Sequence, residues 1–271
     1  MAIPKPKVSI VMGTYNRANL IERSIKSIFE QSFKDFETII VDDGSTDNTE
    51  KIIKKYPMVR YFKNKKNLGL PYSLNLGIKL SKGEYIARLD DDDYWCHPDK
   101  LKMQTDFLDN NPDYMVCGGG MIVIDGHNQE KFRYLKKEQD AEIRKRALLA
   151  NPFSHTTTMF RKEAALRVGL YDDIRHEDWN FWLKLGRMGK FYNFPEYFTK
   201  YLMAGQNASY LNLKQKIRCR GTLKIISLNK KYYPYALMAY LFVAGEYIYS
   251  LIPQRIKVRL YPMLSRIKRS L

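Results

Sequence analysis

The chain has 271 residues and a formal net charge of +17, and 45% of its residues are hydrophobic. That hydrophobic fraction supports a sizeable core and excludes a globally disordered protein. The three cysteines form no CxxC pair, which argues against a disulfide framework or a zinc site and favours a reducing compartment. The amino-terminal stretch MAIPKPKVSI has no apolar segment of the signal-peptide type, so we expect a cytoplasmic protein.

Strands and helices alternate over about the first 90 residues. Short apolar runs rich in β-branched residues predict four buried strands, over 8–12, 38–41, 59–62 and 84–89. Apolar residues at helical spacing predict three intervening helices, over 19–31, 45–56 and 72–80. Ser45 and Asp47 are suitable N-cap residues for the second of these helices. The alternation predicts an α/β fold with a mostly parallel central sheet and flanking helices.

The second half of the chain is less regular. Its apolar spacing predicts three helices, over 137–150, 162–168 and 178–188. The stretch HTTTMF predicts a strand over 155–160.

The stretch RLDDDDYW, residues 88–95, places four aspartates at the end of the fourth predicted strand. Like charges about 5 Å apart repel by roughly 3 kcal/mol at an effective dielectric constant near 20. Solvent, a basic neighbour such as Arg88, or a bound cation must offset that repulsion. Alternate side chains of an extended segment share a face, so Asp90 and Asp92 can converge on Mg²⁺ or Mn²⁺. The alternative is a solvated acidic turn, but ligands of open α/β sheets bind at this edge.

Polar residues also follow the first two predicted strands. TYNR, residues 14–17, offers an aromatic ring, an amide and a guanidinium, which suit a base and a diphosphate. VDDGS places Asp42 and Asp43 after the second strand, where a carboxylate can bind a nucleobase or ribose or can cap a helix. The pattern alone leaves these two interpretations open.

A further pair of carboxylates, Glu177 and Asp178, begins the helix in HEDWNFWLKL. Carboxylates at a helix N-terminus are stabilised by the helix dipole, so ordinary capping explains them. The alternative is that one of them is a general base, which takes a proton from a hydroxyl within hydrogen-bond reach.

The positive charge is concentrated after residue 213. Residues 214–271 hold thirteen lysines and arginines and one acid, Glu246, so they carry +12 of the net +17. Residues 235–252 are nearly all apolar, but they are short for a membrane span and contain Glu246, so we expect an interfacial helix. Beyond them, arginines flank an apolar stripe; the arginines are Arg255, Arg259, Arg266 and Arg269, and the stripe is Ile256, Leu260, Leu264, Ile267 and Leu271. That pattern is typical of a basic helix lying on anionic lipid.

Three segments taken together resemble the family 2 glycosyltransferases, which have the GT-A fold. The segments are VSIVMGTYNRANLIERSIKSIFEQSFKDFETIIVDDGSTDNT, NLGLPYSLNLGIKLSKGEYIARLDDDD and HEDWNFWLKL. The resemblance covers roughly residues 7–190, and in the first hundred residues it holds almost motif by motif. It implies transfer of a sugar from a nucleotide-diphosphate donor to a hydroxyl acceptor, with inversion.

Carried over by position, the resemblance assigns five residues to the nucleotide pocket, the last of them as a base contact: Thr14, Tyr15, Asn16, Arg17 and Asp42. Asp90 and Asp92 would form the DxD motif beside the donor, with Asp92 as the main ligand of the divalent cation, Mn²⁺ or Mg²⁺. Asp178 would be the general base.

The chain departs from the family pattern at two places. The stretch YSLNLGI keeps Asn75 but lacks the arginine that many relatives carry immediately before it, and YLMAGQNAS, 201–209, lacks the arginine and histidine of a YRxH-like stretch. No third metal ligand is therefore assigned. The QxxRW signature of processive synthases is also absent, so we expect transfer of a single sugar.

We therefore expect a metal-dependent, hexosyltransferase-type enzyme with a UDP-sugar as the first choice of donor and a lipid-linked saccharide as acceptor. Residues 1–213 would form the GT-A domain, with a nucleotide-sugar half, 1–110, and an acceptor half, 111–213. Residues 214–271 would form a basic helical tail that attaches the protein to the inner face of the cell membrane.

Two other hypotheses remain. A nucleic-acid-binding protein with an inactive α/β domain would use the basic tail, although its basic residues alternate with aliphatic ones and the acidic edge would repel phosphate. A transferase-like binding module would bind the donor without turnover.

Overall fold

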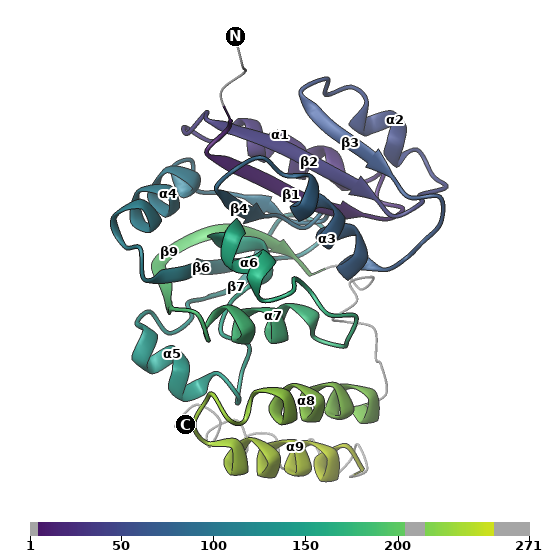
Figure 1. Ribbon diagram of the computed structural model, residues 1–271. Coiled ribbons are helices and arrows are strands. Elements are labelled where there is room, and N and C mark those ends of the chain that lie inside the picture. The colour runs from purple at the N-terminus through teal and green to yellow at the C-terminus, as the bar shows by residue number, and fades with distance from the viewer. Residues whose placement is uncertain (1–4, 204–214, 252–271) are drawn as a thin grey trace.

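The computed structural model describes residues 5–203 and 215–251. Within them, nine strands form one sheet in the order β3-β2-β1-β4-β8-β6-β9-β5, with β7 paired to β6 (Figure 1). The first four strands are parallel: β1 (Val8–Thr14), β2 (Phe36–Asp42), β3 (Val59–Lys63) and β4 (Tyr85–Arg88). The others are β5 (Tyr94–Trp95), β6 (Tyr114–Ile124), β7 (Glu130–Tyr134), β8 (Met159–Arg161) and β9 (Lys190–Leu202).

The sheet becomes mixed beyond β4. β8 is antiparallel to both β4 and β6, whereas β6 and β9 are parallel. All four strands predicted in the first half of the chain are present, and the carboxyl ends of β1, β2 and β4 meet at one edge, as expected of parallel neighbours.

Helices cover both faces of the sheet because the side chains of each strand alternate between them. On β1, Ile10 and Met12 face one cluster, which also contains apolar residues of α1 (Ile21–Phe29), α2 (Thr49–Ile53) and α4 (Lys100–Asn110). Val11 faces the other cluster, which is covered by α3 (Leu70–Leu80), α5 (Asp140–Arg146), α6 (Lys162–Arg167) and α7 (Glu177–Leu185).

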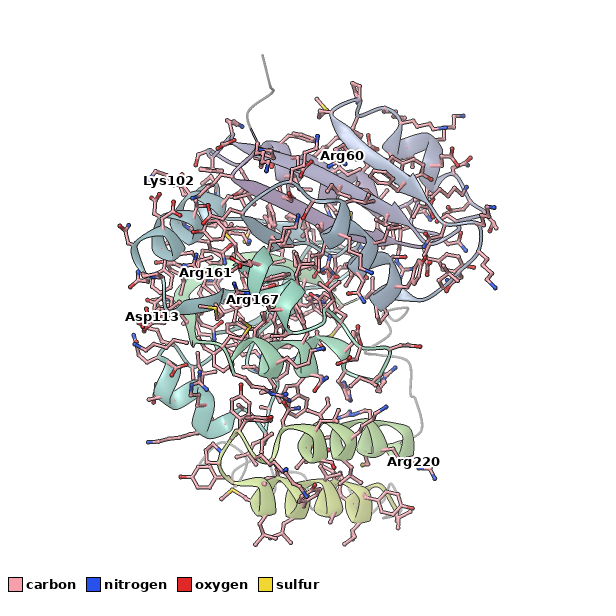
Figure 2. All side chains as sticks on the ribbon, viewed as in Figure 1. Arg60, Lys102, Asp113, Arg161, Arg167 and Arg220 are labelled. Atoms are coloured by element: carbon pink, nitrogen blue, oxygen red, sulfur yellow. The ribbon has the colours of Figure 1, made fainter. Side chains whose placement is uncertain are left out.

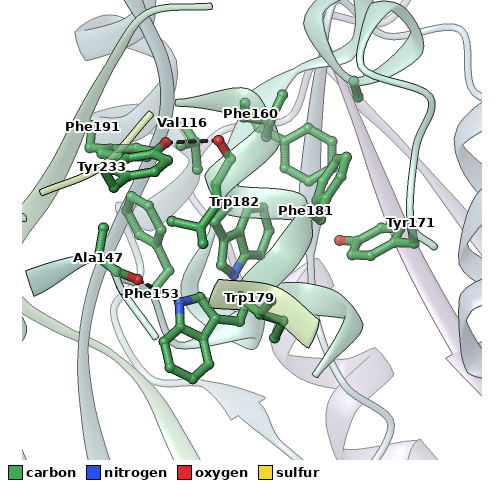
Figure 3. Packing of buried hydrophobic residues seen from close by; sticks show 14 of the residues in the cluster. Val116, Ala147, Phe153, Phe160, Tyr171, Trp179, Phe181, Trp182, Phe191 and Tyr233 are labelled. Carbon is green, nitrogen blue, oxygen red and sulfur yellow. Dashed lines mark hydrogen bonds between the residues drawn. The ribbon is translucent and has the colours of Figure 1, made fainter. Parts of the chain in front are cut away.

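A pair of helices, α8 (Gln215–Asn229) and α9 (Ala236–Leu251), forms a further layer on the side of α7 away from β1–β3 (Figure 1). Buried residues of both helices belong to the same hydrophobic cluster as α7. Tyr233, between the two helices, donates a hydrogen bond through its hydroxyl to the Leu183 carbonyl oxygen at 2.7 Å, and its ring stacks near Phe191 (Figure 3). The Asn229 side chain donates to Asn180 Oδ1 at 2.8 Å. Residues 215–251 thus extend the hydrophobic core of the domain.

The helix predicted over 235–252 is confirmed as α9. Among the residues that the structure describes, no helix combines the length and apolar character needed to cross a bilayer. The basic amphipathic helix predicted beyond Pro253 lies outside the described residues.

Two local predictions were wrong. Residues 155–157 form a 3₁₀ turn, η1 (His155–Thr157), and only 159–161 form a strand. Thr157 and Thr158 donate their hydroxyl hydrogen bonds to the carbonyl oxygens of Ser154 and His155, so these side chains satisfy a turn instead of a strand. The second predicted helix begins at Thr49, not at Ser45, whose hydroxyl accepts a hydrogen bond from the Asn16 amide. Asp47, the other predicted cap, does accept a hydrogen bond from the Thr49 amide at 3.0 Å.

Candidate functional site

A cavity of about 1090 Å³ lies at the carboxyl ends of β1 and β4 and extends to the start of α7. It brings together six of the predicted site residues: Thr14, Tyr15, Arg17, Asp90, Asp92 and Asp178. The other two, Asn16 and Asp42, are not among its lining residues. Residues far apart in sequence therefore share one cavity, as the strand-end argument requires.

The four aspartates at the end of β4 have four different environments. Asp90 forms an ion pair with Arg88, whose side chain is completely buried. Burial acts to raise the pKa of Asp90, but the charge and hydrogen bond of Arg88, together with the nearby His155, outweigh it, and the pKa lies below its usual range. Asp93 is also buried; its Oδ1 accepts a hydrogen bond from the Leu202 amide at 3.3 Å, which ties the acidic loop to β9.

Asp91 and Asp92 carry the charge that this loop does not neutralise. Burial and the charge of Asp92 raise the pKa of Asp91 to about 7, and its one ion pair, to Arg17 Nε, is 3.6 Å long. Burial and the charge of Asp90 raise the pKa of Asp92 to about 6. The fold therefore holds these carboxylates close together although they repel each other. A bound cation would reduce that repulsion.

The donor set fits a magnesium- or manganese-type ion. Carboxylate oxygens are the ligands that these ions prefer, and Mg²⁺ is commonly held by one or two carboxylates together with substrate phosphates. The part of the chain that the structure describes contains no group of three or more acidic, histidine or cysteine side chains arranged to hold a metal by themselves. Asp92 and Asp90 would therefore need phosphate oxygens to complete the coordination.

The loop after β2 is organised by its two aspartates. Asp42 is fully buried; its Oδ1 accepts from the Ser45 amide at 2.7 Å and its Oδ2 from the Tyr61 hydroxyl at 2.7 Å. Asp43 lines the cavity, and its carboxylate accepts hydrogen bonds from the Leu68 and Gly69 amides. Asp43 is thus the member of the pair that lines the cavity, whereas Asp42 stabilises the loop through its buried hydrogen bonds.

Asn16 has a similar structural role. It adopts a left-handed backbone conformation with φ of 53°, and its Oδ1 accepts a hydrogen bond from the Thr46 amide at 2.9 Å. The bond joins the loop after β1 to the loop after β2, so Tyr15 and Arg17 on either side of Asn16 face the cavity.

The far end of the cavity contains Glu177 and Asp178, the first two residues of α7. Asn151 donates a hydrogen bond from its side-chain amide to Asp178 Oδ2 at 2.7 Å. The backbone carbonyl oxygen of Asn151 accepts a hydrogen bond from Lys136 Nζ at 3.0 Å. These contacts orient the Asp178 carboxylate. Burial and the charge of Asp178 raise the pKa of Glu177 to about 7.

A buried network beneath the acidic loop was not predicted as a unit. Arg88 donates from Nε to His155 Nε2 at 3.0 Å, and the Tyr171 hydroxyl lies 2.9 Å from the same nitrogen. Burial and the charge of Arg88 lower the pKa of His155 to about 4, so the neutral imidazole is the acceptor. Asn75 binds both the amide and the carbonyl of Tyr171 through its side chain. Only the position of Arg88 beside the aspartates gave a sequence signal for this network.

The sequence of the chain matches the family model described as glycosyl transferase family 2 over residues 9–169. It is 36% identical over 201 residues to the putative glycosyltransferase EpsE of Bacillus subtilis, and the matched region covers 70% of this chain and 71% of that protein. It is 33% identical over 265 residues to an uncharacterized glycosyltransferase of Methanocaldococcus jannaschii, covering 88% and 89%. It is 28% identical over 189 residues to the amylovoran biosynthesis glycosyltransferase AmsE of Erwinia amylovora, covering 67% and 70%.

Solved structures share the architecture. The mannosyltransferase PcManGT from Pyrobaculum calidifontis, in complex with GDP-Man and Mn²⁺, superposes with a TM-score of 0.66 at 16% identity, covering 97% of this chain and 81% of that one. S. aureus TarS 1–349, in complex with UDP-GlcNAc, gives a TM-score of 0.64 at 18% identity, covering 93% and 69%. At these identities the likeness concerns the fold, and it confirms the predicted GT-A fold.

Proposed function

The chain belongs to glycosyl transferase family 2, and we propose that it transfers a single sugar, with inversion, from a UDP-sugar to a hydroxyl acceptor. The observation that carries this proposal is the shared cavity, which places the strand-end residues Arg17 and Asp92 and the helix residue Asp178 around one space. A donor with its diphosphate at the acidic loop would have its sugar directed towards α7.

In this proposal Asp178 is the general base. Its carboxylate, oriented by Asn151, takes the proton of the acceptor hydroxyl as the oxygen attacks the anomeric carbon from the face opposite the diphosphate. The bond from the anomeric carbon to the diphosphate breaks in the same step, and the electron pair leaves with the nucleotide. One displacement of this kind inverts the configuration.

The residues around the donor would hold it and balance its charge. Tyr15 offers a ring and Arg17 a guanidinium at the nucleotide end of the cavity. A divalent cation held by Asp92 and Asp90, when bound, supplies positive charge against the departing diphosphate. The relative PcManGT was solved with Mn²⁺, which supports this choice of ion.

We further propose that the protein works on the inner face of the cell membrane with a lipid-linked acceptor. The outer face of α9 supports this, because four apolar side chains on it are strongly exposed: Leu237, Leu241, Ile248 and Leu251. The relative AmsE is named for amylovoran biosynthesis, which is consistent with an acceptor in a polysaccharide pathway.

The direct test is a thermal-shift screen of nucleotide sugars with the full chain, with and without Mn²⁺. We expect UDP-sugars to raise the melting temperature only with the metal, and wild type but not Asp92→Ala to hydrolyse the donor slowly. If no nucleotide sugar raises the melting temperature, the proposed function is wrong. Binding without any hydrolysis or transfer would favour the binding module.

A further inference from the structure

Two arginines, Arg175 and Arg218, line the end of the cavity formed by α7 and α8. Arg175 lies two residues before α7, and Arg218 is in the first turn of α8. Neither guanidinium forms an ion pair or a hydrogen bond with another side chain among residues 5–203 and 215–251. The carboxylates of Glu177 and Asp178 line the same space without pairing to them. With respect to the described part of the chain, both guanidinium groups are therefore available to a ligand.

The packing of α8 brings the two arginines to the same place. An ideal Cβ on Gly221 of α8 would lie 2.8 Å from Arg175 Cβ and 2.9 Å from its Cγ, so the helix backbone rests directly on the stem of Arg175. The His176 ring also packs beside Gly221, and the pKa of His176 is lowered by burial and by the charges of Arg175 and Arg218. This end of the cavity thus has two neighbouring positive charges.

The donor diphosphate does not account for these charges. The donor end has Arg17 and the aspartates at the end of β4. α8 lies on the opposite side of α7 from β1–β3 (Figure 1). Asp178 stands at the start of α7, so the arginines lie on the acceptor side of the proposed base. Guanidinium groups bind phosphate oxygens in a bidentate manner and with charge assistance.

We propose that Arg175 and Arg218 form a subsite for the phosphate of the acceptor, which is then a sugar joined to a lipid through phosphate. The inference rests on the proposed function, because it assigns the acceptor class to the same cavity. The exposed apolar face of α9 belongs to the helix that pairs with α8, so a lipid attached to that phosphate would have an apolar surface nearby.

Titration calorimetry of the full chain with farnesyl phosphate, inorganic phosphate and farnesol tests the subsite. Each probe is added to protein saturated with UDP and Mn²⁺. We expect farnesyl phosphate to bind the wild type, inorganic phosphate to bind more weakly, and farnesol not to bind. Arg218→Gln should weaken the binding of farnesyl phosphate by about tenfold, since a charge-assisted hydrogen bond is lost. Arg175→Gln should weaken it to the same extent. Arg218→Lys, which keeps the positive charge, should lose less affinity for farnesyl phosphate than Arg218→Gln.

The matched control is Arg220→Gln, on the same helix, whose side chain is exposed and does not line the cavity (Figure 2). It should change farnesyl phosphate binding by less than about twofold, and all variants should retain UDP affinity. Competition between farnesyl phosphate and UDP, or weaker UDP binding by the arginine variants, would place the arginines in the donor site and overturn the proposal.

Equal binding of inorganic and farnesyl phosphate, or an equal loss in Arg220→Gln, would also overturn it. If the wild type binds no UDP, the proposed function is wrong. Titrations with farnesyl phosphate in the absence of UDP still test whether the two arginines bind phosphate.

Discussion

Arg88 and His155 are joined by a 3.0 Å hydrogen bond from Nε to Nε2 beneath the acidic loop, although 67 residues separate them. The same guanidinium pairs with Asp90 and donates to the carbonyl oxygens of Val11 and Leu89. One fully buried side chain therefore holds the middle of β1, the end of β4 and the turn before β8 in one arrangement.

Replacing Arg88 with methionine should lower the free energy of unfolding by about 3 kcal/mol, because it leaves a largely enclosed carboxylate without its partner. Urea unfolding measures this. The control is Arg167→Met, which removes an exposed pair with Glu163 one helical turn away (Figure 2); it should cost less than about 0.5 kcal/mol. Equal effects of the two changes would contradict the structural role of Arg88.

Asp92→Asn should stabilise the metal-free protein while abolishing its response to metal. Burial and the charge of Asp90 disfavour the ionised Asp92 carboxylate, so removing the charge should add about 1 kcal/mol at pH 8. The Mn²⁺-dependent rise in melting temperature with UDP should disappear. Asp106→Asn, on the exposed side of α4, should leave both measurements unchanged. A normal metal response in Asp92→Asn would exclude Asp92 as the main ligand.

Asp178→Asn should lower kcat by about 100-fold or more, because an amide cannot accept the acceptor proton. UDP affinity should stay within about twofold, since Asp178 belongs to α7 and not to the strand-end loops proposed to bind the nucleotide. Steady-state kinetics together with calorimetry separate the two effects. Weaker UDP binding with unchanged turnover would assign Asp178 to the donor instead.

Glu177→Gln should alter how stability depends on pH. Burial and the charge of Asp178 raise the pKa of Glu177 from 4.5 to about 7, so the folded wild type binds more protons than the unfolded chain between these values. The wild type loses the corresponding stability as the pH rises through about 7. The variant should therefore gain about 1–2 kcal/mol relative to wild type between pH 4.5 and pH 8.

Urea unfolding of both proteins across this pH range measures the difference. Glu163→Gln, at an exposed position of α6, serves as the control and should show a constant difference. A flat difference for Glu177→Gln as well would mean that Glu177 is ionised without cost in the folded protein.

Leu237→Glu combined with Leu241→Glu should reduce sedimentation with liposomes that contain phosphatidylglycerol. Each leucine contributes roughly 1.5 kcal/mol when its side chain is buried in an apolar medium, so binding should weaken by more than about tenfold. Leu166→Glu, which changes an exposed leucine on α6, is the matched control. Unchanged sedimentation of the double variant would count against α9 as the membrane contact.

The amino-terminal half of the fold could be predicted because the central strands β1, β2 and β4 are largely buried on both faces and appear as continuous apolar runs. β6 and β9 give no such signal: Tyr114–Ile124 contains three consecutive glycines, and Lys190–Leu202 contains a proline and alternating polar residues. Their pairing with each other, distant in sequence, is a tertiary property.

The site was predictable to a similar extent. Strand-end position placed Arg17, Asp90 and Asp92 in the cavity, and helix-start position placed Asp178 there. Asp43 lines the cavity and Asp42 does not. The spacing of the two aspartates in the sequence does not determine this difference. His155 and Tyr171 meet only through folding, since the spacing of their two segments does not indicate that these side chains are hydrogen-bonded.

The hydrogen bonds of Asn229 and Tyr233 to α7 have a geometric consequence. Because they join the α8–α9 pair to the helix that carries Asp178, the fold sets the separation between the apolar surface of α9 and the carboxylate proposed as the base. A molecule resting on a bilayer through α9 would glycosylate only hydroxyls held at one height above the lipid headgroups.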